Sequence, residues 1–158
     1  MAIAPNTTFV SGAVLTAAQQ NAFGFSTVAL SQATANYTLT TTLATTGLTV
    51  TFTPLANRNY KISWYEPACQ ITNIATGTTA MELRVTNAAG TLLQSVVSRN
   101  PAAISGNIQV LCMHIGTFAA ASTVIVACAN TSSLSDGPAL SRAAGRAASL
   151  LIEDIGPA

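Results

Sequence analysis

The chain has 158 residues with six Lys and Arg, five Asp and Glu and a net charge of +1; 7% of its residues are charged and 49% are apolar. A typical soluble domain carries about 25% charged residues. This composition argues against a nucleic-acid-binding surface, which needs clustered Lys and Arg, and it predicts that much of the surface is buried against other copies or other proteins.

The first 25 residues differ from the rest of the chain. Residues 7–15 are short and extended, and residues 16–23 carry a capping-box pattern with Thr16 as N-cap and Gln19 three residues on. A helix of about two turns is too short to be stable alone, so it must dock on its own domain, a neighbouring copy or a larger assembly. We expect a docking arm at 1–30, with these contact residues: Phe9, Val14, Leu15, Phe23 and Phe25.

From Asn36 onward the sequence has period two and is rich in Thr, Val and Ile, with turn signals about every ten residues. The segments 107–115 and 123–129 have the composition of long, mostly buried strands. The turn Asn87–Gly90 has hairpin length and predicts positive φ at its glycine. The expected strands are 36–41, 46–53, 60–65, 69–74, 80–86, 92–97, 107–115, 123–129 and 148–155.

Eight or nine strands without an intervening helix favour antiparallel sheets packed face to face. At this strand count a jelly roll is the commonest arrangement, so we predict an all-β, jelly-roll-like sandwich over residues 34–158. An immunoglobulin-like sandwich is the alternative. Its Cys-Trp-Cys order is not met, because the single tryptophan, Trp64, precedes all three cysteines.

The three cysteines, Cys69, Cys112 and Cys128, show no Cys-x-x-Cys spacing, and each lies in an apolar run. We expect free buried thiols. No apolar run reaches the about 18 residues of a membrane-spanning helix, and the first residues lack the basic start of a secretory signal. These features predict synthesis in a cytoplasm without export and no membrane span.

Groups for catalysis are scarce. A Ser-His-Asp triad would have to use the one histidine, His114, with Asp136 or Asp154, and no Gly-x-Ser-x-Gly motif is present. His114 has the sequence context of a structural or interface histidine. Gly-rich phosphate loops are also lacking, so we expect no enzyme, no cofactor and no metal site.

The acidic residues could form a hydrolase only if two of them faced each other across a cleft. Glu153 and Asp154 are adjacent on an expected strand and therefore point to opposite faces. We expect them to pair with Arg58, Arg142 or Arg146 in an assembly. A hydrolase acting through Glu66 or Glu82 is the least favoured hypothesis.

Trp64 and Tyr65, next to Glu66, could form a platform on which a sugar ring stacks. Adjacent strand residues ordinarily divide between core and surface, which is the competing interpretation. A glycan-binding module with these two aromatic residues as its surface recognition site therefore remains an alternative function.

Three segments carry a resemblance to a known family. Thr8-Phe-Val-Ser-Gly-Ala-Val-Leu-Thr-Ala-Ala-Gln-Gln-Asn21 resembles the opening of small tailed-bacteriophage virion proteins. Leu150-Leu-Ile-Glu-Asp-Ile-Gly-Pro157 looks like their ending, and the Thr-Phe-Thr strand and Arg-x-Tyr loop within 49–62 are similar to their central strand pair. The chain departs from this pattern after Asn21, where many relatives continue a longer charged helix.

The resemblance implies a structural protein of the virion, assembled in the host cytoplasm, with a body like that of trimeric jelly rolls. We expect a homotrimer docked through the arm on a tail protein as a minor tail or fibre protein. A decoration or head-fibre protein docked on the major capsid protein is the alternative. Loops at 68–79, 99–107 and 131–145 are then free to contact a host surface, including a host glycan.

Overall fold

The computed structural model describes residues 26–71, 78–99, 106–132 and 139–158. All regular structure in these ranges is β, which confirms the expected all-β class; the predicted helix at 16–23 lies outside the described residues. The strands are β1 (Ser26–Ala33), β2 (Tyr37–Thr38), β3 (Ala44–Phe52), β4 (Arg58–Ile71), β5 (Thr78–Val85), β6 (Leu92–Arg99), β7 (Gly106–Gly116), β8 (Thr123–Thr131), β9 (Ala139–Leu140) and β10 (Ala148–Pro157).

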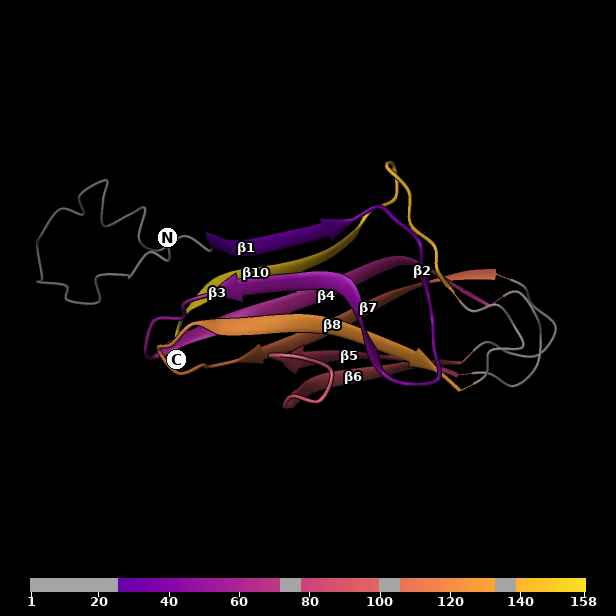
Figure 1. Ribbon diagram of the computed structural model, residues 1–158. Coiled ribbons are helices and arrows are strands. Elements are labelled where there is room, and N and C mark those ends of the chain that lie inside the picture. The colour runs from indigo at the N-terminus through magenta and orange to yellow at the C-terminus, as the bar shows by residue number, and fades with distance from the viewer. Residues whose placement is uncertain (1–25, 72–77, 100–105, 133–138) are drawn as a thin grey trace, which may run out of the picture.

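The strands form two antiparallel sheets (Figure 1). Sheet A has the order β1-β10-β4, with β7 on the other side of β4; the short strands β9 and β2 continue sheet A beside the end of β4. Sheet B has the order β3-β8-β5-β6. The inner faces of both sheets contribute to one hydrophobic core.

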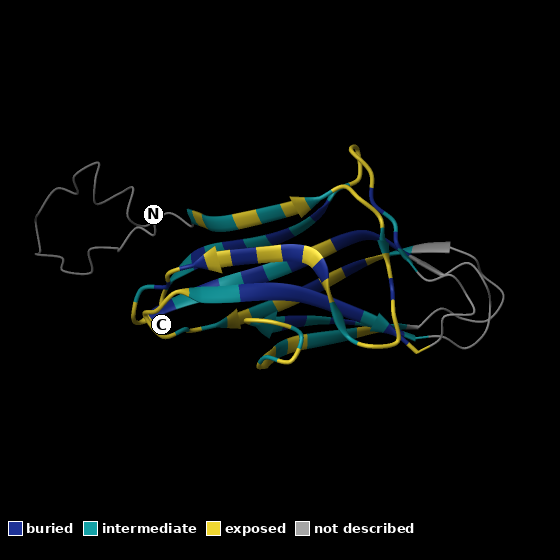
Figure 2. Ribbon diagram, viewed as in Figure 1, coloured by how far each residue is buried: buried dark blue, intermediate teal, exposed yellow. Residues whose placement is uncertain are grey.

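Period-two alternation explains how the core is filled. In β3 the side chains of Leu48, Val50 and Phe52 are buried and the intervening residues are exposed, whereas β8 is buried along most of its length (Figure 2). Phe52, Tyr60 and Phe118 form a cluster of edge-to-face rings. The buried core consists of Leu39, Leu48, Val50, Phe52, Tyr60, Ile62, Trp64, Cys69, Met81, Leu83, Val110, Cys112, Ile125, Ala127, Ala129, Leu140, Ala148, Leu150 and Ile152.

Strand β1 was not expected from the sequence, which placed residues 26–30 in the arm. The structure instead pairs β1 with β10, so the sandwich begins at Ser26. The pattern is hard to read because a bulge between Thr27 and Ala29 interrupts the period of two. Val28 packs against the core, whereas Leu30 points outward and is exposed.

Strand β4 is one long strand where the sequence predicted two, at 60–65 and 69–74. It runs through Pro67, and its pairing with β7 shifts between Glu66 and Cys69. Proline has no backbone N–H to donate a hydrogen bond to the neighbouring strand. It is tolerated here because the shift in pairing is a β-bulge. Because Ala68, Cys69 and Thr79 are buried strand residues, the expected exposed loop at 68–79 is wrong at both of its ends.

The predicted hairpin around residues 87–90 is confirmed between β5 and β6. The expected positive φ at Gly90 is wrong, because Thr86 adopts the left-handed conformation, with a φ of 74°. Glycine is required at position 90 for another reason: a Cβ there would lie 1.7 Å from the carbonyl oxygen of Val85. The Asn87 side chain accepts a hydrogen bond from the Ala89 amide at 2.9 Å and completes the turn.

Replacing Gly90 with Ala is therefore expected to destabilise the fold by about 1–3 kcal/mol, because the backbone must move to relieve the clash. Gly145→Ala is the matched control, since nothing lies within 4 Å of a Cβ at that position. Urea denaturation of both variants measures the difference. Equal stability of the two variants would contradict the proposed close approach in the β5–β6 turn.

Candidate assembly surface

The outer face of sheet A carries most of the exposed large apolar side chains. The described residues include seven such side chains, and two of them, Leu92 and Val97, lie on β6 of sheet B. The other five are on sheet A: Leu30, Tyr65, Leu111, Met113 and Ile115. This concentration marks the outer face of sheet A as the candidate contact surface.

Strand register places four of these residues in one patch. Leu111 lies directly opposite Tyr65 across β7 and β4, and Met113 and Ile115 follow at two-residue intervals along β7. We call Tyr65, Leu111, Met113 and Ile115 the β4–β7 patch. The sequence predicted a mostly buried β7, whereas only its inner face is buried in this chain. A strand that is apolar on both faces is expected where the outer face is covered by a partner.

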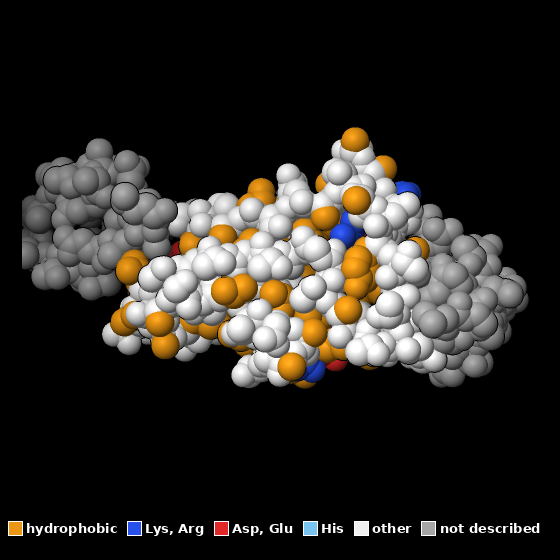
Figure 3. Space-filling model, in the orientation of Figure 1, with side chains coloured by type: hydrophobic (Ala, Val, Ile, Leu, Met, Phe, Trp, Pro, Cys, Tyr) orange, Lys and Arg blue, Asp and Glu red, His pale blue; other side chains and the backbone are white. Residues whose placement is uncertain are grey.

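Most charges of the chain are neutralised within the chain. Within the described residues, four ion pairs engage eight charged side chains: Arg58–Asp154, Lys61–Glu153, Arg84–Glu82 and Arg142–Glu66. Two of these pairs, Arg58–Asp154 and Arg142–Glu66, are buried. The surface is therefore even poorer in free charge than the composition indicates, and the face in Figure 3 shows mainly neutral side chains.

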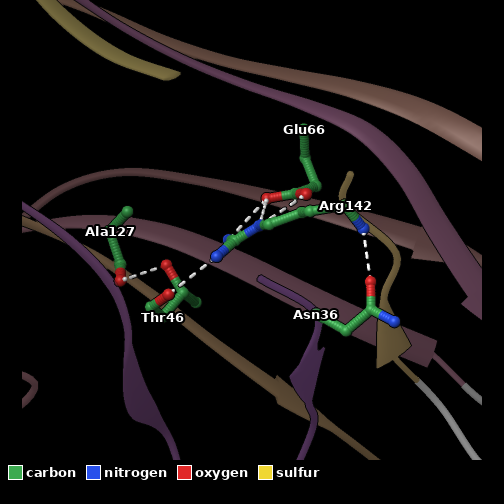
Figure 4. A network of polar contacts seen from close by, with 5 residues as sticks. All are labelled: Asn36, Thr46, Glu66, Ala127 and Arg142. Atoms are coloured by element: carbon green, nitrogen blue, oxygen red, sulfur yellow. Dashed lines mark hydrogen bonds and ion pairs between the residues drawn. The ribbon is translucent and has the colours of Figure 1, made fainter. Parts of the chain in front are cut away.

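Arg142 joins the two sheets through a buried polar network (Figure 4). Its Nε and Nη2 donate to the Glu66 carboxylate of β4, at 3.0 Å to Oε1 and 2.8 Å to Oε2, and its Nη1 donates to the Thr46 carbonyl of β3 at 2.9 Å. Its backbone amide donates to the Asn36 side chain at 2.7 Å. The expected exposed loop at 131–145 is therefore wrong at Arg142, which is 5% exposed.

The second buried pair joins strands β4 and β10 of sheet A. Arg58 Nε and Nη2 donate to the two Asp154 oxygens at 2.6 and 2.5 Å, and Asp154 Oδ1 also accepts from the Gly156 amide at 3.0 Å. The next acid, Glu153, points to the outer face and pairs with Lys61 at 2.7 Å. The prediction that Glu153 and Asp154 face opposite ways is confirmed, and both of their partners belong to the same chain.

Strand parity in the sequence indicates which charged residues are buried. Arg58 and Glu66 have the same strand parity as the inward residue Trp64, and Asp154 has the same parity as the inward residue Ile152. Period two therefore places all three charges on inner faces. A buried charge needs a partner of opposite sign, which would have predicted pairing inside the chain.

The two aromatic residues proposed for sugar recognition divide between core and surface. Trp64 is fully buried, whereas Tyr65 is 37% exposed on the outer face of sheet A. Trp64 therefore presents no ring face to a ligand in this chain. The predicted docking residues of the arm (Phe9, Val14, Leu15, Phe23 and Phe25) lie outside the described residues.

The groups considered for catalysis have structural partners. Glu66 and Glu82 are each held in an ion pair, and the His114 ring packs edge-to-face on Phe118 at 6.3 Å between centroids. The described ranges hold no group of three or more His, Cys, Asp or Glu arranged to bind a metal ion. Within the same ranges, no helix is long and apolar enough to cross a membrane.

The three cysteines are free and buried, as predicted. Burial raises the pKa of the Cys112 and Cys128 thiols to about 11, and it also raises the pKa of Cys69. The thiolate is the reactive form of cysteine. All three thiols are therefore protonated at neutral pH. Cys69 and Cys112 belong to the core, whereas Cys128 is buried next to the Glu82–Arg84 ion pair of sheet B.

We expect the folded protein to react very slowly with a thiol reagent such as dithionitrobenzoate at pH 8, because the thiols are both protonated and inaccessible. After unfolding in guanidinium, three equivalents are expected to react at once. The absorbance of the released thiolate follows both reactions. Rapid labelling of any one cysteine in the folded protein would contradict this assignment.

Comparisons with solved structures give distant likenesses. No protein-family model matches the chain, and no curated protein matches it in sequence. The crystal structure of dimeric latent PorU from Porphyromonas gingivalis is similar over 81% of this chain and 13% of that chain, with 12% identity and a TM-score of 0.41. The structure of infectious bursal disease virus Gt strain is similar over 85% of this chain and 42% of that chain, with 12% identity and a TM-score of 0.26. The chain spans less than half of either protein, and neither likeness bears on function.

Proposed function

We propose that this chain is a non-enzymatic structural protein on the exterior of a bacteriophage particle, a homotrimer docked through its N-terminal arm as a minor tail or fibre protein. The low free charge carries this proposal, because the chain has only eleven charged side chains and at least eight of them are paired in the described residues. An isolated soluble domain ordinarily needs a charged surface. A subunit whose surface is covered by neighbours in an assembly does not need such a charged surface.

The strand order supports a jelly roll within this proposal. The long strands form a β1-β10-β4-β7 sheet facing a β3-β8-β5-β6 sheet. Eight strands in two antiparallel sheets with crossings between them are typical of that fold. The similarity of segments 8–21, 49–62 and 150–157 to small tailed-phage virion proteins supports the same class of protein.

A capsid decoration or head-fibre protein is the alternative placement, because a low charge and a docking arm suit it equally well. A glycan-binding role is less well supported, since Tyr65 is exposed but its neighbour Trp64 is buried. The ion pairs of Glu66 and Glu82 favour structural roles for both acids over a hydrolase.

A cryo-electron map of the intact particle, with a labelled antibody to this chain as a locator, tests the proposal. Density at the tail supports the tail-associated role. Density on capsid symmetry axes supports the decoration role and overturns the tail placement. Absence of the chain from purified particles would overturn the structural role altogether.

A further inference from the structure

We infer that the β4–β7 patch (Tyr65, Leu111, Met113 and Ile115) is the surface through which copies of this chain bind one another. The inference rests on the proposed homotrimer and gives that assembly a contact surface.

The patch has the chemistry of a covered surface. Leu111, Met113 and Ile115 are 57%, 45% and 53% exposed and lie in a line along β7, about 7 Å apart. Among the described strands, β7 is also an edge of sheet A and pairs with β4 alone. Its residues 106–116 include no Lys, Arg, Asp, Glu or Pro, the residues that protect free edges in monomeric proteins.

The charges beside the β4–β7 patch favour a second copy of this chain as its binding partner. The flanking charges, Lys61 and Glu153, already neutralise each other at 2.7 Å. A strongly acidic or basic partner therefore finds no complementary charge beside the patch. Another copy brings an equally apolar face and a net charge of only +1, so repulsion between copies is small.

The available area is adequate for association. Four strands about 4.8 Å apart and about nine residues long, at about 3.3 Å per residue, offer a face of about 600 Å². A standard protein interface buries about 800 Å² on each partner. The outer face of β1, β10, β4 and β7 therefore reaches about three quarters of that area, which is the lower end of the range for specific interfaces.

The outer face of sheet B is more polar and provides the control. Thr45, Thr49 and Thr51 are exposed on β3, and the Glu82–Arg84 ion pair lies next to Cys128 and Val126 in the register. Val97 on β6 is 60% exposed, similar to Leu111. Val97→Glu therefore adds the same charge at similar exposure on the opposite sheet.

The experiment compares the full-length chain with Leu111→Glu and Val97→Glu by sedimentation equilibrium and light scattering. We expect a trimer for the natural chain and for Val97→Glu, and a monomer for Leu111→Glu at micromolar concentration. A glutamate at the centre of an apolar contact is expected to raise the dissociation constant by about 100-fold or more. Leu111→Thr combined with Met113→Thr, which preserves strand propensity, is expected to weaken the trimer as well. Circular dichroism verifies that each variant remains folded.

The outcomes separate this inference from the proposed function. A trimer that persists in both patch variants, or that dissociates only in Val97→Glu, overturns the assigned surface and leaves the trimer intact. A natural chain that stays monomeric at every concentration overturns both the homotrimer and this surface. The location in the particle is tested independently by the cryo-electron map.

Discussion

Replacing Arg142 with Ala is expected to lower the free energy of unfolding by about 3–5 kcal/mol, because the buried Glu66 carboxylate would lose its ionic partner. The same change removes the hydrogen bond to the Thr46 carbonyl and so loosens the contact between the sheets. Chemical denaturation monitored by Trp64 fluorescence measures the loss, since this residue lies on the same strand as Glu66.

Arg146→Ala is the matched control four residues away. The Arg146 guanidinium is exposed and donates to the Ser141 hydroxyl, and its backbone bond to Ala143 is retained in the variant, so the change in stability is expected to be less than about 0.5 kcal/mol. Combining Arg142→Met with Glu66→Leu removes both charges and is expected to recover much of the lost stability. If Arg142→Ala were as stable as Arg146→Ala, the network would not be a structural tie between the sheets.

Replacing Asp154 with Ala is expected to cost a similar amount, about 3–5 kcal/mol, because it leaves the buried Arg58 guanidinium without its carboxylate. The two oxygens of Asp154 hold Arg58 at 2.6 and 2.5 Å and also accept the Gly156 amide. Thermal unfolding followed by circular dichroism detects the change as a large fall in Tm.

The adjacent acidic residue, Glu153, provides the control for the Asp154 variant. Glu153→Ala breaks the partly exposed pair with Lys61, and such pairs contribute about 0–1 kcal/mol. A large difference between the two variants is expected, although the residues are adjacent in sequence. Equal losses would mean that the opposite orientation of these side chains does not govern their energetics.

The regular part of the fold could be predicted because its strands alternate cleanly. Leu48, Val50 and Phe52 identify β3 and its inner face without any long-range information. The hairpin of β5 and β6 could be predicted because turn chemistry is local. By contrast, β1 carries a bulge, and β9 has two residues, so neither has a pattern long enough to recognise.

The polar network and the β4–β7 patch depend on contacts between residues far apart in the chain, and these contacts cannot be predicted from a single sequence. Arg142 meets Glu66 across 76 positions, and Arg58 meets Asp154 across 96. Strand parity predicts that Arg58, Glu66 and Asp154 point inward. It does not predict which residue each of them pairs with. The apolar residues of β7 were recognised, and what could not be predicted was that one face of β7 is left uncovered in the single chain.

The pairing of β1 with β10 has a consequence for the timing of folding. Strand β1 is an edge strand beside β10 (Figure 1). In their register, Leu30 lies opposite Leu151. A ribosome that adds 5–20 residues each second needs on the order of ten seconds to make the intervening chain. During that interval β1 has no partner strand and one side of β4 is open. Sheet A can therefore be completed only after β10 has been synthesised, because β10 pairs with both β1 and β4.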